Sequence, residues 1–320
     1  MNTASATVAQ RDDWNRHWDD FALAAEYNPA QRYRRRLILS MLGAEGTAGP
    51  PRLLDIGSGQ GDFAANVAAT FPTTEVLGLE LSASGVEVAR RKVPGADFVQ
   101  WDLLAERQPP EPRRNWATHA VCSEVLEHLD EPDRLLANAR AWLAHGCRLI
   151  VTVPGGPMSQ FDRHIGHRKH YQPAELQALL EQAGFRVEAA HGAGFPFFNL
   201  YRRVVIARGS KLMADVAQEP SPAARMAMAA FDALFRWNLG TRGWQTVAVA
   251  IADAAPGPRV VISKDESLLF LRKRTGPADC DSRDAWPAER AVSNPGNGRS
   301  RTKSRAAQVE RAPNSVPPGR

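Results

Sequence analysis

The sequence predicts an α/β protein built on a Rossmann-like, mostly parallel sheet of seven strands with helices on both faces. Three observations support this prediction. Apolar strand patterns alternate with helical patterns from residue 52 to residue 192, a glycine-rich turn follows the first strand, and a final strand follows a helical insertion. Alternating strands and helices build parallel sheets whose faces are covered by the helices. Such sheets bind ligands at the carboxyl ends of their strands.

The predicted strands are short apolar runs bounded by polar residues or glycine. They cover residues 52–58, 74–81, 96–103, 117–126, 147–155, 185–192 and 243–253. Helical apolar spacing occupies residues 60–71, 82–93, 131–143 and 172–185. Ser82 is a candidate N-cap, Pro132 fits the first turn of its helix, and Gly184 ends a helix.

The chain divides into three predicted regions. Residues 1–48 form an N-terminal helical extension, and residues 49–255 form the main domain. Within it, a helical insertion at 194–240 is rich in Phe, Tyr and Trp, which suits a cover over an apolar acceptor; packing onto the sheet is the alternative. Residues 256–320 form a low-complexity tail, predicted to be disordered, with SLLFLRK as a candidate edge strand.

Composition excludes several classes of protein. The 320 residues are 43% hydrophobic, which is enough for a core, and no apolar run reaches the roughly 18 residues of a membrane-spanning helix. The first residues lack the apolar segment of a signal peptide, which predicts a cytoplasmic location. Three widely spaced cysteines argue against a disulfide framework. Residues 275–320 hold eight Lys/Arg and five Asp/Glu, hence +3 of the net +5, so no specific nucleic-acid partner is indicated.

The segment RLLDIGSGQGDF, residues 52–63, carries the glycine-rich turn. It lacks the lysine of a P-loop. Its third glycine stands two positions after the second, whereas a dinucleotide fingerprint places the third glycine three positions after the second. Gly57 and Gly59 allow the backbone to approach a ligand closely. Asp55 is expected to brace the turn by accepting backbone N–H bonds.

Two further carboxylates end the second and third predicted strands. Glu80 can accept both hydroxyls of a ribose in charge-assisted hydrogen bonds. Asp102 can accept the exocyclic amine of an adenine. A parallel sheet brings both to the edge that holds the glycine turn, so the sequence predicts a nucleoside site that does not require a pyrophosphate.

The pattern D-x-G-S-G-x-G, with an acid closing the second strand and an aspartate closing the third, resembles the class I S-adenosylmethionine-dependent methyltransferases. The resemblance covers about residues 50–190 and, more loosely, 10–255. It implies an antiparallel last strand, S-adenosylmethionine as cofactor, and methyl transfer to an oxygen (or nitrogen) of a small-molecule acceptor, with S-adenosylhomocysteine as product. The implied cofactor-binding residues are Asp55, Gly57, Ser58, Gly59, Gly61, Glu80, Leu81, Asp102, Leu103, Ser123 and Glu124.

The segment CSEVLEHL, residues 122–129, resembles the EVLEH variant of small-molecule methyltransferases, including the ubiquinone-biosynthesis O-methyltransferase branch. One hypothesis places Ser123 and Glu124 in the cofactor and substrate cleft. A second makes Glu124, Glu127 and His128 ligands of Mg²⁺ or Mn²⁺, because two carboxylates and an imidazole suit such a cation. A third has Glu127 and His128 cap the next helix or bond the backbone.

The segment FDRHIGHRKHYQ follows the fifth predicted strand and holds three histidines, where a lid over the substrate would lie. Histidine has an ordinary pKa near neutrality, so one of them is expected to take a proton from an acceptor hydroxyl. His167 is the preferred candidate, and His164 and Tyr171 are further candidate catalytic residues.

Other functions stay open. The basic tail suits recruitment of an RNA or protein substrate, and a noncatalytic module would bind S-adenosylmethionine without transferring its methyl group. The amphipathic stretch RMAMAAFDALFRW leaves peripheral contact with a membrane surface open.

Overall fold

The computed structural model describes residues 28–42, 51–209 and 220–253, all within one compact unit, Met1–Arg259. The predicted tail at 256–320, its candidate edge strand SLLFLRK and residues 1–27 of the predicted extension lie outside the described residues.

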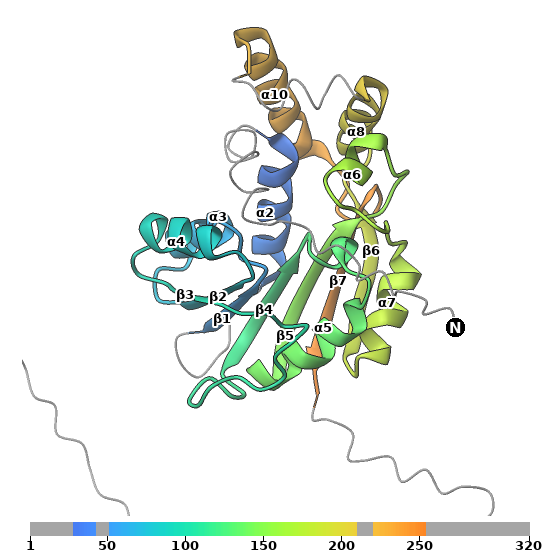
Figure 1. Ribbon diagram of the computed structural model, residues 1–320. Helices are drawn as coiled ribbons and strands as arrows, with labels where there is room; N and C mark the ends of the chain where they lie inside the picture. Colours follow the sequence, from blue (N-terminus) through green and yellow to red (C-terminus); the bar gives the residue numbers. More distant parts are fainter. Residues whose placement is uncertain (1–27, 43–50, 210–219, 254–320) are drawn as a thin grey trace, which may run out of the picture. The chain divides into compact units, whose positions relative to one another are not determined.

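A seven-stranded sheet organises the fold, in the order β3-β2-β1-β4-β5-β7-β6 (Figure 1). Strands β1 to β5 pair in parallel, and β7 runs antiparallel between β5 and β6. This confirms the predicted sheet and its antiparallel last strand. The strands are β1 (Arg52–Ile56), β2 (Glu75–Glu80), β3 (Asp97–Gln100), β4 (Ala117–Ser123), β5 (Leu143–Pro154), β6 (Arg186–Ala193) and β7 (Gln245–Ala252).

Helices cover both faces of the sheet, as predicted. The described helices are α2 (Pro29–Leu42), α3 (Asp62–Thr70), α4 (Ala83–Lys92), α5 (Pro132–Ala139), α6 (Gln160–His164), α7 (Pro173–Gln182), α8 (Phe197–Arg208) and α10 (Pro222–Leu234), with short 3-10 helices η1 (Leu126–His128), η2 (Arg140–Trp142) and η3 (Phe235–Trp237). None of them combines the length and hydropathy that crossing a membrane requires.

The two faces of the sheet carry separate cores. Leu54 and Ile56 of β1 pack with α5 and α7 on one face, whereas Leu53 packs with α2, α3 and α4 on the other. Successive side chains of a strand point to opposite faces, so a strand that is covered on both sides must be apolar throughout. This explains why the parallel strands read as short continuous apolar runs.

The predicted helix boundaries follow from local chemistry. Ser82 caps α4 by accepting a hydrogen bond from the Gly85 amide at 3.0 Å, and Pro132 occupies the first turn of α5. Gly184, with φ +82°, follows α7 in the left-handed conformation that glycine adopts without strain. These three signals of the sequence are confirmed.

Helix α2 is built into the main domain. Its residues Ile38 and Leu42 are buried in the core that it shares with β1 and β4, and Arg148 of β5 donates to the Met41 carbonyl at 3.0 Å. The described part of the predicted extension therefore contributes to the same core as the sheet.

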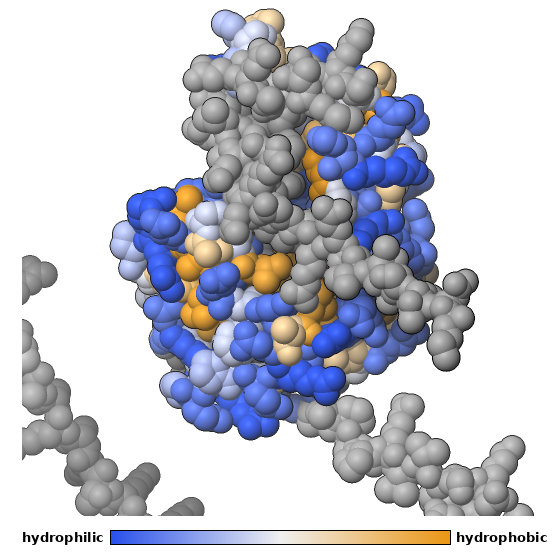
Figure 2. Space-filling model, in the orientation of Figure 1, coloured by the Kyte–Doolittle hydropathy of each residue, from blue (hydrophilic) through white to orange (hydrophobic). Residues whose placement is uncertain are grey.

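The predicted insertion forms α8, α10 and η3 before β7. Its aromatic side chains pack mainly on one another and on α2, where the Tyr33 ring lies 5.4 Å from that of Phe198 and 5.6 Å from that of Phe235. Figure 2 shows the molecule in the orientation of Figure 1, and on this face hydrophobic residues group near the middle, between mostly hydrophilic surfaces. The insertion and α2 thus form a joint aromatic cluster.

Candidate active site

The glycine turn lies between β1 and α3 and is fixed by backbone bonds. The Gly57 and Ser58 amides both donate to the Leu79 carbonyl of β2, at 2.8 and 3.0 Å. Gly57, Gly59 and Gly61 have φ of +71°, +53° and +76°, a backbone region that residues other than glycine rarely adopt. A Cβ atom on Gly57 would lie 2.5 Å from Cγ2 of Val125, so the turn packs directly against the EVLEH segment.

Glu80 braces this turn. Its carboxylate accepts the Gly59 amide at 2.8 Å with one oxygen and the Ser82 amide at 2.9 Å with the other. The side chain is only 5% exposed, so these charge-assisted bonds act in a medium of low polarity. Glu80 thereby ties the turn after β1 to the start of α4.

Asp55 does not brace the turn, and that prediction is wrong. Its side chain is buried, its Oδ2 has no hydrogen-bond partner, and among the described residues no backbone amide donates to it. Burial, and then the nearby charge of Glu80, raise the pKa of Asp55 to about 7. The pairing of β1 with β2 brings Glu80 next to the turn, and Glu80 braces it instead.

The remaining predicted cofactor residues occupy the same edge of the sheet. Asp102 follows β3, is half-buried, and accepts the Leu104 amide at 2.9 Å. Leu103 beside it is buried, and Leu81 after β2 is 39% exposed. Ser58 is buried with no hydrogen-bond partner for its Oγ within the described structure. Its hydroxyl therefore retains its capacity to bind a polar ligand.

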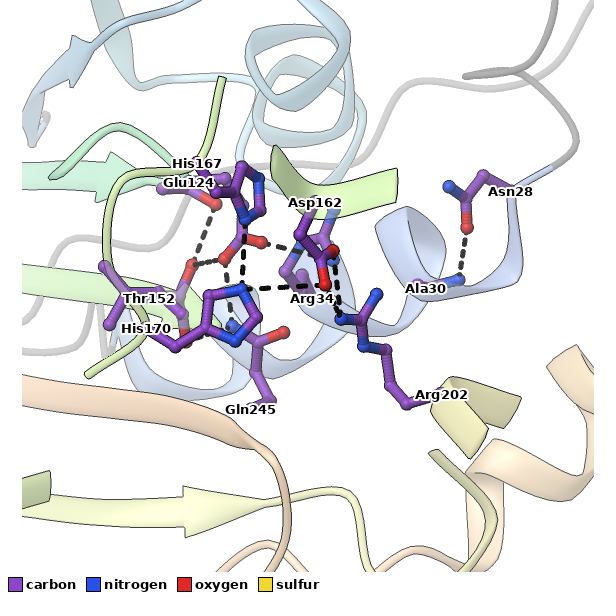
Figure 3. A network of polar contacts seen from close by, with 12 residues as sticks. Asn28, Ala30, Arg34, Glu124, Thr152, Asp162, His167, His170, Arg202 and Gln245 are labelled. Atoms are coloured by element: carbon purple, nitrogen blue, oxygen red, sulfur yellow. Dashed lines mark hydrogen bonds and ion pairs between the residues drawn. The ribbon is translucent and has the colours of Figure 1, made fainter. Parts of the chain in front are cut away.

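Ser123 ends β4 and Glu124 follows it, next to this edge. The Ser123 hydroxyl shares a 2.9 Å hydrogen bond with that of Thr152 on β5. Glu124 adopts a left-handed φ of +56°, which costs about 1–3 kcal/mol in a residue other than glycine. Its carboxylate accepts Nε2 of Gln245 at 2.9 Å and pairs with Arg34 of α2 at 3.4 Å (Figure 3). Strands β4, β5 and β7 and helix α2 thus meet at one acid.

Glu127, three residues on, has a different environment. It is fully buried, and neither carboxylate oxygen has a hydrogen-bond partner in the described part of the chain. Burial, followed by the charge of Glu124, raises its pKa well above the ordinary value. The Glu127 side chain therefore does not cap the next helix, because the N-cap of α5 is Glu131 and no side chain donates or accepts a capping bond there.

The predicted metal set is divided by the structure. Potential ligand atoms of Glu127, His128 and His167 lie within 4.8 Å of one another, and those of Asp162, His167 and His170 form a second such group. Glu124 belongs to neither of these groups. The long-range contact of His167 with η1 was not visible in the sequence.

Hydrogen bonds assign the tautomers of two histidines. Nδ1 of His170 lies 2.8 Å from the Gly156 carbonyl, which only accepts, so this nitrogen carries the proton. Burial lowers the pKa of His170 and keeps the ring neutral, so its Nε2 is an acceptor. Nδ1 of His167 lies 3.1 Å from that Nε2 and must donate to it (Figure 3). The neutral His167 ring is left with a lone pair on Nε2.

A buried ion pair supports the two histidines. Asp162 of α6 accepts Nη2 of Arg202 on α8 at 2.8 and 3.0 Å, and it lies 3.9 Å from Nε2 of His170. Burial raises the pKa of Asp162, but Arg202 and the Ser159 hydrogen bonds outweigh it and hold that pKa below its usual range. Asp162 therefore stays ionised and joins the insertion to the histidine segment.

The three candidate catalytic residues differ in position. Burial, followed by the charge of His128, lowers the pKa of His167 to about 2, so the expectation of a base that titrates near neutrality is wrong. His164 is exposed at the end of α6. Tyr171 is buried, its hydroxyl donates to the Leu126 carbonyl at 3.3 Å, and burial raises its pKa to about 12. Of these three residues, only His167 belongs to the two groups of potential metal ligands described above.

Sequence reasoning missed several polar residues of this site. They are Arg34, Thr152, Asp162, Arg202 and Gln245. Gln245 offered a signal, because it is a long polar side chain at the start of an apolar strand. The Ser159-x-x-Asp162 spacing predicts a capping box, which the structure contains. Nothing in the arginine-rich sequence of α2 distinguished Arg34.

We predict that Asp55→Asn changes how stability depends on pH. Because the folded-state pKa of Asp55 is raised, its protonated form favours folding below about pH 4, and this contribution is lost as pH rises to about 7. The variant lacks this loss, so its stability relative to the natural protein should rise by up to about 4 kcal/mol between about pH 4 and pH 8. Urea unfolding at both pH values measures it, and parallel pH profiles would contradict the assignment.

We also predict that ¹⁵N chemical shifts at neutral pH report the Nδ1–H tautomer for His167 and His170. Histidine tautomers are set by the partner of the other ring nitrogen. The exposed ring of His164 serves as the reference for averaged tautomers. In His170→Ala, His167 loses its fixed acceptor and its shifts should move toward the averaged values. Unchanged shifts would show that His170 does not set the tautomer.

Comparisons with known proteins agree with this geometry. The family described as "Methyltransferase domain" matches residues 23–190, which is more than half of the chain. Trans-aconitate 2-methyltransferase of Methylobacterium nodulans is 31% identical over 137 residues, 43% of this chain and 50% of that protein. Malonyl-[acyl-carrier protein] O-methyltransferase of Halalkalibacterium halodurans is 31% identical over 120 residues, 36% of this chain and 43% of that protein.

The matched part of the chain thus spans about half the length of the first of these relatives. Among solved structures, phosphoethanolamine N-methyltransferase 2 of Haemonchus contortus, in complex with S-adenosyl-L-methionine, has a TM-score of 0.53 at 16% identity. That alignment covers 76% of this chain and 60% of the other, and it shows the shared fold. With its family match, sheet order and glycine turn, the chain belongs to the methyltransferase-domain family.

Proposed function

We propose that the protein transfers a methyl group from S-adenosylmethionine to an oxygen (or nitrogen) of a small-molecule acceptor and releases S-adenosylhomocysteine. The observation that carries this proposal is the glycine turn held by Glu80 at the carboxyl edge of the sheet. Family membership and the relatives' names support it.

The residues at this edge fit the cofactor. The Glu80 carboxylate accepts the Gly59 and Ser82 amides, and an ionised carboxylate offers about four acceptor sites, which suits it to hydrogen bonds with ribose hydroxyls. The Ser58 hydroxyl, buried with no hydrogen-bond partner in the described structure, suits another polar group of the nucleoside. Asp102 would face the adenine. When bound, the cofactor supplies the electrophilic methyl group on its sulfonium.

The task of the chain is then to align the acceptor and exclude water. The aromatic cluster of α2, α8 and η3 suits exclusion of water, and the ion pairs of Arg34 and Arg202 fix the polar groups beneath it. His167, with a pKa of about 2, is a weak base at neutral pH. We therefore favour an acceptor that arrives already ionised, such as a carboxylate, which needs no proton removed.

The names of the relatives agree with this preference. They name trans-aconitate and malonyl-[acyl-carrier protein] as acceptors of those proteins. We propose that this chain takes a small carboxylate-bearing molecule rather than a nucleic acid, and that it acts in the cytoplasm. Its position in the ubiquinone-biosynthesis branch remains a proposal that only the EVLEH segment supports.

The described donor set does not fit Mg²⁺. Glu124 is committed to Arg34 and Gln245, and the group around Glu127 offers one carboxylate and two imidazoles. Mg²⁺ prefers oxygen ligands, whereas imidazoles suit transition metals. We therefore assign no step of the reaction to Mg²⁺.

Two other functions make different predictions. A polymer methyltransferase recruited by the basic tail should lose substrate binding when residues 275–320 are deleted, and its binding should weaken with salt. A noncatalytic module should bind S-adenosylmethionine but methylate none of a broad panel of acids, phenols and amines. The proposed enzyme should keep its turnover without residues 275–320.

We predict that calorimetry detects S-adenosylmethionine binding to the full chain. Gly57→Arg should abolish it, because the turn has no room for a side chain. Glu80→Gln should weaken it about tenfold or more by removing a charged acceptor. Glu75→Ala, at the exposed opposite end of the same strand, is the matched control and should bind normally. Failure of the natural protein to bind, or affinity for NAD instead, would refute the proposal.

A further inference from the structure

Exposed hydrophobic side chains concentrate in the insertion. Of the seven large hydrophobic residues that are exposed in the described structure, six lie between residues 195 and 239. They are Phe195, Leu200, Val204, Met226, Trp237 and Leu239. Trp237 is 73% exposed, an unusual position for the largest apolar side chain. Grouped exposed apolar residues mark interaction sites more often than scattered ones do.

Backbone geometry brings three of these residues to one place. Phe195 and Leu239 pair as an antiparallel bridge. Asn238, which lies between Trp237 and Leu239 in the chain, has an extended backbone. Its side chain accepts hydrogen bonds from the Phe197 and Phe198 amides at 2.8 and 3.2 Å. Asn238 thus points inward, whereas the residues on either side of it are exposed, Trp237 by 73% and Leu239 by 47%.

Among the described residues of the insertion, the exposed charges have one sign. Arg236 is exposed next to Trp237, and the guanidinium of Arg242 lies 5.8 Å from the ring centroid of Phe195. In described residues 194–209 and 220–244, every exposed charged side chain is an arginine: Arg203, Arg208, Arg225, Arg236 and Arg242. The one acid in these residues, Asp232, is half-buried and pairs with Arg36 of α2.

We propose that Phe195, Arg236, Trp237, Leu239 and Arg242, here named the Trp237 patch, dock the protein onto the surface of an anionic lipid bilayer. Tryptophan with arginine is the combination that binds at the boundary between headgroups and acyl chains. A surface with arginines and no exposed acid complements a uniformly negative surface, where each cation adds attraction. Protein partners present charges of both signs, for which the patch offers no acceptor carboxylate among its described residues.

Sedimentation of the full chain with vesicles tests this proposal. Vesicles of phosphatidylcholine alone are compared with equimolar phosphatidylcholine and phosphatidylglycerol. The natural protein should bind the anionic vesicles, and added salt should weaken the binding. Arg236→Glu and Trp237→Ser should each bind about tenfold more weakly or worse, whereas Trp237→Phe keeps an aromatic ring and should retain most of the binding.

The matched control is Arg114→Glu, which makes the same change of charge at an exposed arginine before β4, at the end of the sheet away from the carboxyl edge. It should bind within about twofold of the natural protein. Circular dichroism checks that each variant is folded. No binding by the natural protein, equal binding by the patch variants, or an equal loss in Arg114→Glu would overturn the proposal.

A second copy of the chain is the other occupant to exclude. Sedimentation velocity without lipid measures self-association of the natural protein and of Trp237→Ser. A dimer that is lost in Trp237→Ser, together with no binding to anionic vesicles, would assign the patch to self-association and overturn the lipid proposal.

Discussion

The two hydrogen bonds of the Glu80 carboxylate shape the edge of the sheet on which the site depends. The glycine turn and the start of α4 come from different βα units, and this buried carboxylate joins them. Without it, the Gly59 and Ser82 amides would lose their acceptor in a buried region, which costs about 1–3 kcal/mol for each group. Burial, and then the charge of the same acid, raise the pKa of Asp55 on the neighbouring strand to about 7. Glu80 therefore contributes to both the shape and the electrostatics of the proposed cofactor site.

The other half of the edge is organised by two ion pairs. Arg34 brings α2 to Glu124, and Arg202 brings α8 to Asp162. Buried ion pairs add little net stability, but loss of one partner leaves an uncompensated charge, so they specify one arrangement of the elements. They link the aromatic cluster above the site to the strained turn after β4 and to the histidine segment. The same two ion pairs thus fix the positions of α2 and α8 and of the acids beneath them.

The fold could be read from the sequence because its signals are local. Apolar runs, the Ser82 cap and the glycine turn each depend on a few consecutive residues, and the parallel sheet then places Glu80 and Asp102 at one edge. The polar half of the site depends on contacts between distant segments. His167 meets η1 only after the chain folds, and the burial that lowers its pKa is invisible in the spacing of histidines. That Glu80 rather than Asp55 braces the turn likewise follows from the pairing of β1 with β2.

The central claim is that the carboxyl edge around Glu80 is the cofactor site. A crystal structure with S-adenosylhomocysteine tests it most directly. We expect the ribose hydroxyls within hydrogen-bond distance of the Glu80 carboxylate, the purine beside Asp102, and the amino-acid part along the glycine turn. A ligand that binds at another place, or that occupies this edge without contacting Glu80, would contradict the claim.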